Sequence, residues 1–87
     1  MWTSRFQRSA ARFTSMHPEL RDRFARILRD LELDPHQPHL RLHALQGRLS
    51  GMHAVSVSHR YRITLTLRLS EGEIVLLDVG SHDDVYR

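Results

Sequence analysis

The sequence predicts an α+β protein in which an N-terminal helical hairpin packs on a small antiparallel β-sheet. Two patterns carry this prediction. Apolar residues recur at helical spacing up to residue 34, and they recur at every second position from residue 55 onward. Helices followed by strands in this order are typical of a two-layer α+β sandwich. The 87 residues are predicted to form a single domain, residues 1–87.

The first third of the chain is predicted to hold both helices. Residues 1–6 (MWTSRF) carry two aromatic side chains and a threonine, which favour a short strand at these residues, before the first helix. The apolar stripe of the first helix comprises Ala10, Phe13 and Met16. The stripe of the second helix, at i, i+4, i+7, i+8 and i+11, comprises Leu20, Phe24, Ile27, Leu28 and Leu31. Pro18 suits the first turn of this helix, and Asp34-Pro35 ends it.

The second half of the chain has the alternation of a sheet with one buried and one exposed face. Residues 35–43 form a predicted loop that leads into it. The apolar set is Val55, Val57, Tyr61, Ile63, Leu65, Leu67 and Leu69. Turns are predicted near residues 58–60 and at 71–73, and residues 74–79 are apolar on both faces, as in a central strand. The helices should cover the odd-numbered face, so the opposite face is predicted to display Ser56, Arg62, Thr64 and Arg68.

The amino-acid composition excludes several kinds of functional site. The chain has no cysteine, which excludes a disulfide framework, thiol catalysis and cysteine-based zinc sites. Neither a signal peptide nor a run of roughly 20 apolar residues is present, so we expect a soluble, cytoplasmic protein. Three histidines, His36, His39 and His43, are spaced as zinc ligands can be, but the flanking prolines indicate a loop, and we expect no metal and no cofactor.

Positive charge is concentrated between residues 35 and 70. This stretch contains five arginines, five histidines and no acidic residue. Such a concentration is typical of a surface that binds a polyanion, and a solvated basic surface is the alternative reading. Hydroxyl groups between the arginines suit single-stranded nucleic acid, although exposed aromatic side chains for base stacking are few.

Histidine, arginine and tyrosine suffice to cleave RNA without a metal. A base removes the proton of the 2′-hydroxyl, a cation holds the charge on the phosphate, and an acid protonates the leaving 5′-oxygen. Arg62 lies near the start of a predicted strand, His43 enters the sheet from a loop, and His82 and Tyr86 follow the last strand. These four residues are the candidate catalytic group.

The segment RLHALQGRLSGMHAVSVSHRYRITLTL resembles the middle of the RelE/ParE superfamily of bacterial type II toxins. The shared pattern is R-L-H-x-L-x-G, then G, then s-V-s, then y-R-I. The ending VGSHDDVY is similar to that family's glycine, basic residue and terminal aromatic residue. The motifs span about residues 38–86; the middle looks most like the HigB toxins and the ending most like the YafQ toxins.

The resemblance implies a microbial-RNase-like fold and a ribosome-dependent, metal-independent mRNA endoribonuclease that a cognate antitoxin neutralises. It also implies that His43 and His82 transfer protons, that Arg62 contacts the scissile phosphate, and that Tyr86 positions a base. Further RNA-binding residues are expected in the basic half of the chain: Arg48, His53, Ser56, Ser58, Arg60 and Arg68.

The sequence departs from the family around the first long strand. RelE toxins carry lysines near the position of Ser56, and the YafQ histidine and aspartate of this hairpin align with Ser56 and Arg60. The general base is therefore unassigned, and reduced activity is one consequence. Two alternatives stay open: a ParE-like DNA gyrase inhibitor without nuclease activity, and a non-toxic basic RNA-binding module.

Overall fold

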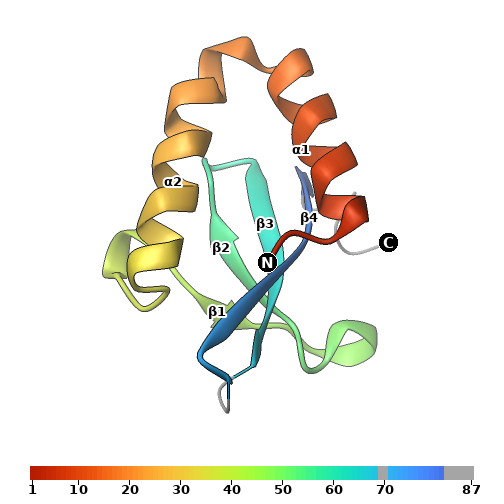
Figure 1. The fold of residues 1–87 in the computed structure, drawn as a ribbon, viewed down its shortest axis with the longest axis vertical. Helices are drawn as coiled ribbons and strands as arrows, with labels where there is room; N and C mark the ends of the chain where they lie inside the picture. Colours follow the sequence, from red (N-terminus) through yellow and green to blue (C-terminus); the bar gives the residue numbers. More distant parts are fainter. Residues whose placement is uncertain (69–70, 82–87) are drawn as a thin grey trace.

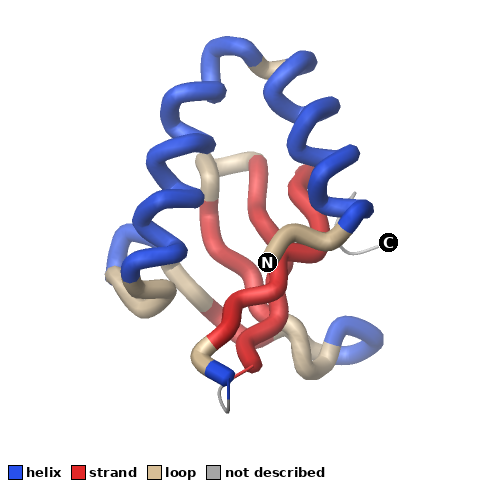
Figure 2. The backbone as a smooth tube through the Cα atoms, viewed as in Figure 1, coloured by secondary structure: helices blue, strands red, loops and turns tan. Residues whose placement is uncertain are grey.

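Two helices cover one face of a four-stranded antiparallel sheet in the computed structural model, which describes residues 1–68 and 71–81 (Figures 1 and 2). The helices are α1 (Ser4–Met16) and α2 (Arg21–Leu33), and short 3-10 turns occur at η1 (Pro18–Leu20), η2 (Pro38–Leu40) and η3 (Gly47–Leu49). The strands, in spatial order, are β1 (His43–Ala44), β2 (His53–Ser56), β3 (Tyr61–Arg68) and β4 (Glu73–Ser81). The predicted α+β architecture is confirmed. None of the helices within the described residues is long and apolar enough to cross a membrane.

The N-terminal strand prediction is wrong for residues 4–6. Helix α1 begins at Ser4, because Thr3 caps it by accepting a hydrogen bond from the Phe6 amide at 3.1 Å. Only Trp2 pairs like a strand, in a parallel bridge with Leu76 of β4. Phe6 is fully buried, one helical turn before Ala10, and therefore extends the predicted apolar stripe in the other direction.

The helix side of the sheet carries the main core. Met16 was predicted in this core, but its side chain is 63% exposed, because α1 ends at this residue. Helix α2 ends at Leu33 as predicted, whereas Pro18 lies in η1, just before α2 begins. The core residues from helices, turn and strands are Phe6, Ala10, Phe13, Phe24, Ile27, Leu31, Leu40, Val55, Val57, Ile63, Leu65, Leu76 and Val79.

The β2–β3 hairpin turns where the sequence predicts, between Ser56 and Tyr61, and its register pairs Ser56 with Arg62 and Ala54 with Thr64. The prediction that Thr64 is displayed to solvent is wrong: it is 4% exposed, and its neighbour Ala54 is fully buried. Leu45 and Val75 are also buried outside the helix-side core. The face away from the helices thus has a small apolar centre, and its solvent-exposed polar residues lie toward the ends of the strands.

Strand β4 lies at the edge of the sheet, so the prediction of a central strand at Ile74–Val79 is wrong. Its pairing with β3 shifts between Thr64 and Leu65, which leaves Leu77 without a partner across the ladder. This β-bulge reverses the alternation, so that Ile74, Leu76 and Val79 all face the helices. Apolar residues therefore occur at consecutive positions without the strand being central.

Candidate nucleic-acid interface

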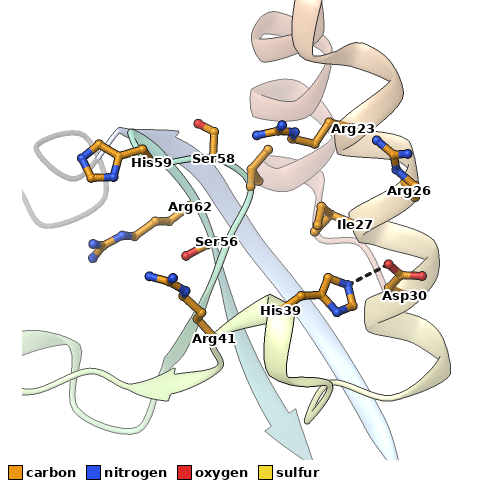
Figure 3. A pocket seen from close by; sticks show the side chains of 11 residues that line it. Arg23, Arg26, Ile27, Asp30, His39, Arg41, Ser56, Ser58, His59 and Arg62 are labelled. Carbon is orange, nitrogen blue, oxygen red and sulfur yellow. Dashed lines mark hydrogen bonds and ion pairs between the residues drawn. The ribbon is translucent and has the colours of Figure 1, made fainter.

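A basic cleft of about 580 Å³ opens between helix α2 and the β2–β3 hairpin (Figure 3). Four residues of α2 form one wall, and the hairpin forms the other. His39 of η2 and Arg41 lie between the two walls. The lining residues are Arg23, Arg26, Ile27, Asp30, His39, Arg41, Ser56, Val57, Ser58, His59 and Arg62.

Charge in the basic cleft is strongly unbalanced. Among the described residues, the lining contains four arginines and two histidines but one carboxylate, that of Asp30. Guanidinium groups bind phosphate through two parallel N–H donors, and a concave, positively charged surface concentrates anions. The serine hydroxyl groups of Ser56 and Ser58 add neutral donors and acceptors. The basic cleft is thus suited to a ligand that presents several phosphates.

The hairpin register places two predicted residues together. Ser56 and Arg62 are directly paired across β2 and β3, so their side chains leave the same face of the sheet. Ser58, in the turn, lines the same cleft, and its hydroxyl accepts a hydrogen bond from the Arg60 amide at 3.3 Å. Three residues that the sequence analysis selects are therefore brought to one wall.

Arg41 adopts a strained backbone conformation at the bottom of the basic cleft. Its φ of 54° and ψ of 46° lie in the left-handed helical region, and it is the only residue other than glycine with a positive φ in the described part of the chain. This conformation costs an L-residue roughly 1–2 kcal/mol. Such strain is concentrated at functional sites, where the local geometry serves binding.

His39 and Asp30 form a close pair in the basic cleft. The His39 Nε2 atom lies 2.9 Å from Asp30 Oδ2 (Figure 3). The Asp30 side chain is 27% exposed and the His39 side chain 51%, so one partner is partly sheltered and the other faces the cleft. The pair joins η2 to the last turns of α2.

Other predicted residues lie outside the basic cleft. His43 is exposed on β1, and its Nδ1 lies 2.9 Å from the Arg41 carbonyl oxygen, which accepts the hydrogen bond. It pairs with Ala54, so it lies across β2 from the strand that carries Arg62, on a neighbouring row of the sheet. Arg60 is exposed in the turn, with its guanidinium 6.0 Å from the centre of the Tyr61 ring.

Three further predicted RNA-binding residues do not line the basic cleft. Arg68 is six residues further along β3 than Arg62, about 20 Å away at the usual rise of an extended strand, and lies 3.9 Å from both Glu71 and Glu73. Arg48 is exposed on η3. His53 lies at the start of β2, and its Nδ1 is buried without a hydrogen-bond partner among the described residues.

The remaining two catalytic candidates, His82 and Tyr86, lie outside the described residues. The last described residue before them, Ser81, pairs with Tyr61, next to Arg62. Residues 1–68 and 71–81 contain no group of three histidine, aspartate or glutamate side chains that could hold a metal ion. The histidines whose spacing resembles that of zinc ligands contact different partners: His39 contacts Asp30, and His43 contacts the Arg41 carbonyl oxygen.

Sequence reasoning missed the contribution of helix α2. Arg23 and Arg26 lie on its exposed side, where a helical arginine normally is, and only the packing of α2 beside the hairpin brings them to the basic cleft. Three other cleft residues belong to the stretch between residues 35 and 70 that is rich in arginine and histidine: His39, Arg41 and His59. The density of basic side chains in this stretch is the sequence signal that could have identified them.

Known structures resemble this chain over almost its whole length. YafQ from E. coli strain BL21(DE3) has a TM-score of 0.80 and 11% identity, and the match covers 99% of this chain and 94% of YafQ. The YoeB/ParE toxin from Agrobacterium tumefaciens has a TM-score of 0.77 and 12% identity, over 94% of this chain and 95% of that one. The toxin–antitoxin complex RelBE2 from Mycobacterium tuberculosis contains a chain with a TM-score of 0.69 and 18% identity, over 94% of both. No protein-family model matches the sequence, and no curated protein matches it.

These similarities define the class of fold. It is the α+β fold of small toxin proteins, with two helices on one face of an antiparallel sheet. More particularly, it is the fold of the RelE, YoeB and YafQ toxins, and the RelE-like fold predicted from the sequence motifs is confirmed.

Proposed function

We propose that this protein is the toxin of a type II toxin–antitoxin module and that it acts as a metal-independent mRNA endoribonuclease on the ribosome. The observation that carries the proposal is the basic cleft, in which Arg62 and Ser56 of the y-R-I and s-V-s motifs meet three further arginines. A polyanion is the ligand that such a surface attracts. The RelE-like fold provides independent support.

Each proposed role follows from the chemistry of the side chain. Arg62 holds the scissile phosphate and stabilises the charge that develops on its oxygens. His43 and His82 transfer protons between RNA and solvent, and Tyr86 positions a base by stacking. The other polar residues of the hairpin and loops, Arg48, His53, Ser56, Ser58, Arg60 and Arg68, bind the RNA on either side.

A cognate antitoxin is the proposed protein partner. Structures of related folds include the YoeB–YefM complex from Staphylococcus aureus and the RelBE2 complex from Mycobacterium tuberculosis. A flexible acidic segment would match the arginines of the basic cleft and gain affinity by folding on binding. An adjacent reading frame that encodes such a small protein would support this partner.

Induced expression in bacterial cells tests the proposed function. The expected result is growth arrest together with new 5′ ends within translated messages, detected by primer extension, and loss of both with Arg62→Ala or His82→Ala. Growth arrest with intact messages would overturn the nuclease. A supercoiling assay with purified DNA gyrase then identifies the ParE-like alternative, because only an inhibitor reduces supercoiling.

A further inference from the structure

The His39–Asp30 pair has the geometry of a proton-transfer dyad. Because a carboxylate only accepts hydrogen bonds, the neutral imidazole must carry its hydrogen on Nε2, 2.9 Å from Asp30 Oδ2. Nδ1 is then left with a lone pair that can accept a proton. The dyad thus fixes the tautomer in which the second nitrogen is a base, as an orienting carboxylate does in catalytic triads.

The backbone holds His39 in a defined position. It is the middle residue of η2, which Pro38 begins and the fully buried Leu40 anchors in the core. The side chain of Gln37 donates hydrogen bonds to the Asp30 carbonyl at 2.7 Å and to the Asp34 carbonyl at 3.2 Å. These contacts tie η2 to the end of α2, so the imidazole and the carboxylate are held by the same rigid unit. Catalytic groups require support of this kind.

The dyad lies in the same cleft as the arginines that would hold a phosphate. His39 lines the basic cleft together with Arg41, two positions later, and with Arg62 of the β2–β3 hairpin. Asp30 is the one carboxylate among the described lining residues, and the side chain that it contacts is an imidazole rather than a guanidinium group. An acidic residue that served only to neutralise the basic cleft would lie against a guanidinium group.

We propose that His39 is the general base of RNA cleavage in the basic cleft and that Asp30 is its positioning residue. This inference rests on the proposed function and supplies the base that the sequence motifs leave unassigned. His39 Nδ1 removes the proton of a 2′-hydroxyl group, while the oxygen forms a bond with the adjacent phosphorus. The bond from phosphorus to the 5′-oxygen breaks, leaving a 2′,3′-cyclic phosphate and a 5′-hydroxyl.

Protons balance over the cycle. The leaving 5′-oxygen takes a proton that comes from solvent, and the His39 imidazolium returns its proton to solvent after the products separate. Arg62 and Arg41 stabilise the additional charge on the phosphoryl oxygens during the step. No metal ion and no co-reactant other than water is required.

Single-turnover cleavage of an mRNA on programmed ribosomes tests the dyad, with the full chain and three variants. His39→Gln retains a hydrogen bond to Asp30 but removes the base, and a loss of about 100-fold or more is expected from the usual contribution of general base catalysis. Asp30→Asn should lower the maximal single-turnover rate by no more than about 100-fold, the loss expected when the base itself is removed, with little change in the protein concentration that gives half of this rate, since Asp30 orients the base without touching RNA. The matched control is His36→Gln, because His36 is an exposed histidine of the same loop outside the basic cleft.

The pH profile separates a catalytic role from a structural one. The wild-type rate should rise with pH, because only the neutral form of His39 is a base, and His39→Gln should remove this dependence. If the pair only ties η2 to α2, His39→Gln would instead lower the melting temperature and leave the pH profile intact.

The outcomes distinguish the two proposals. Cleavage by His39→Gln within threefold of wild type, or an equal loss in His36→Gln, overturns the base assignment and leaves the nuclease standing. Absence of cleavage by the wild-type protein over the whole pH range overturns the nuclease, and the base assignment with it. If His39→Gln is unfolded, the maximal single-turnover rate and the pH profile of Asp30→Asn decide instead: an unchanged profile and rate overturn the dyad.

Discussion

Ser56 and Arg62 are directly opposed across β2 and β3, and both line the basic cleft. This pairing determines the position of Arg62 in two respects. The hydrogen-bonding register sets its position along the strand, and the alternation of side chains sets the face of the sheet on which it lies. A shift of one residue in the hairpin would turn Arg62 toward the helices. The guanidinium group is therefore positioned by the sheet itself and not by a loop.

Substitution of Arg62, even by lysine, should lower the rate of mRNA cleavage. Arg62→Ala should reduce mRNA cleavage by about 100- to 1,000-fold, the usual effect of removing one donor that stabilises a developing oxyanion. Arg62→Lys should retain charge but lose the planar pair of donors, and we expect an intermediate rate. Cleavage rates on programmed ribosomes, with circular dichroism to verify folding, provide the measurement. Equal rates for Arg62→Lys and wild type would show that charge alone matters here.

Helix α2 should contribute to RNA binding through Arg26. For single-stranded nucleic acid the slope of log K against log salt changes by about 0.7 for each phosphate contact. Arg26→Ala is expected to reduce the slope by this amount, whereas Arg29→Ala, an exposed arginine on the same helix outside the basic cleft, should leave it unchanged. Fluorescence anisotropy with a 2′-deoxy oligonucleotide at several salt concentrations measures both. Identical slopes in the two variants would remove α2 from the interface.

Replacement of Arg41 by glycine should weaken RNA binding but have little effect on stability. Glycine adopts the left-handed conformation of this residue without steric cost but loses more backbone entropy on folding, so Arg41→Gly should change the free energy of unfolding by less than about 1 kcal/mol. RNA affinity should nevertheless fall, because one guanidinium group leaves the basic cleft. Urea denaturation and anisotropy on the same protein test the two effects. Unchanged affinity would mean that Arg41 serves the backbone only.

Thr64 offers a test of the apolar centre on the face away from the helices. Its Oγ1 is buried and has no hydrogen-bond partner among the described residues. Valine has nearly the same shape without the hydroxyl, so Thr64→Val should leave stability unchanged or raise it by about 1 kcal/mol. The urea midpoint gives this change, and Thr66→Val on the same strand, where the side chain is only half-buried, provides the comparison. A marked destabilisation would falsify the assignment of Thr64 as an unsatisfied hydroxyl.

Periodicity predicted the regular elements well because burial on one side imposes it. The stripe around Phe24 and Ile27 and the alternation around Ile63 are consequences of one shared core, so they are visible in the sequence. The bulge at Leu77 and the bridge of Trp2 to Leu76 are not visible in this way. Each of these features depends on which residue of a strand distant in the sequence lies opposite, and no local sequence pattern indicates this pairing.

The residues of the candidate site also fall into those that the sequence predicts and those that only the folded structure reveals. Arg62 and Ser56 stand in an alternating strand, so their common face follows from the sequence. The pairing of Asp30 with His39 joins residues nine positions apart on a helix and a turn, and Arg26 reaches the basic cleft only through tertiary packing. Local patterns identify residues of the sheet, whereas the second wall requires the folded chain.

The contacts between the start of the chain and β4 set the stage of synthesis at which the protein can complete its fold. Thr3 donates a hydrogen bond to the Leu76 carbonyl at 2.8 Å, and Arg5 lies 3.1 Å from Asp78, in both cases 73 positions later. During synthesis the first helix emerges long before its partner strand, and such non-local contacts form late. Folding is consequently completed only after the last strand has been made, and a toxin of the proposed kind would spare the message that encodes it until then. An incomplete product would expose the apolar side of α1 and be a natural substrate for chaperones and proteases.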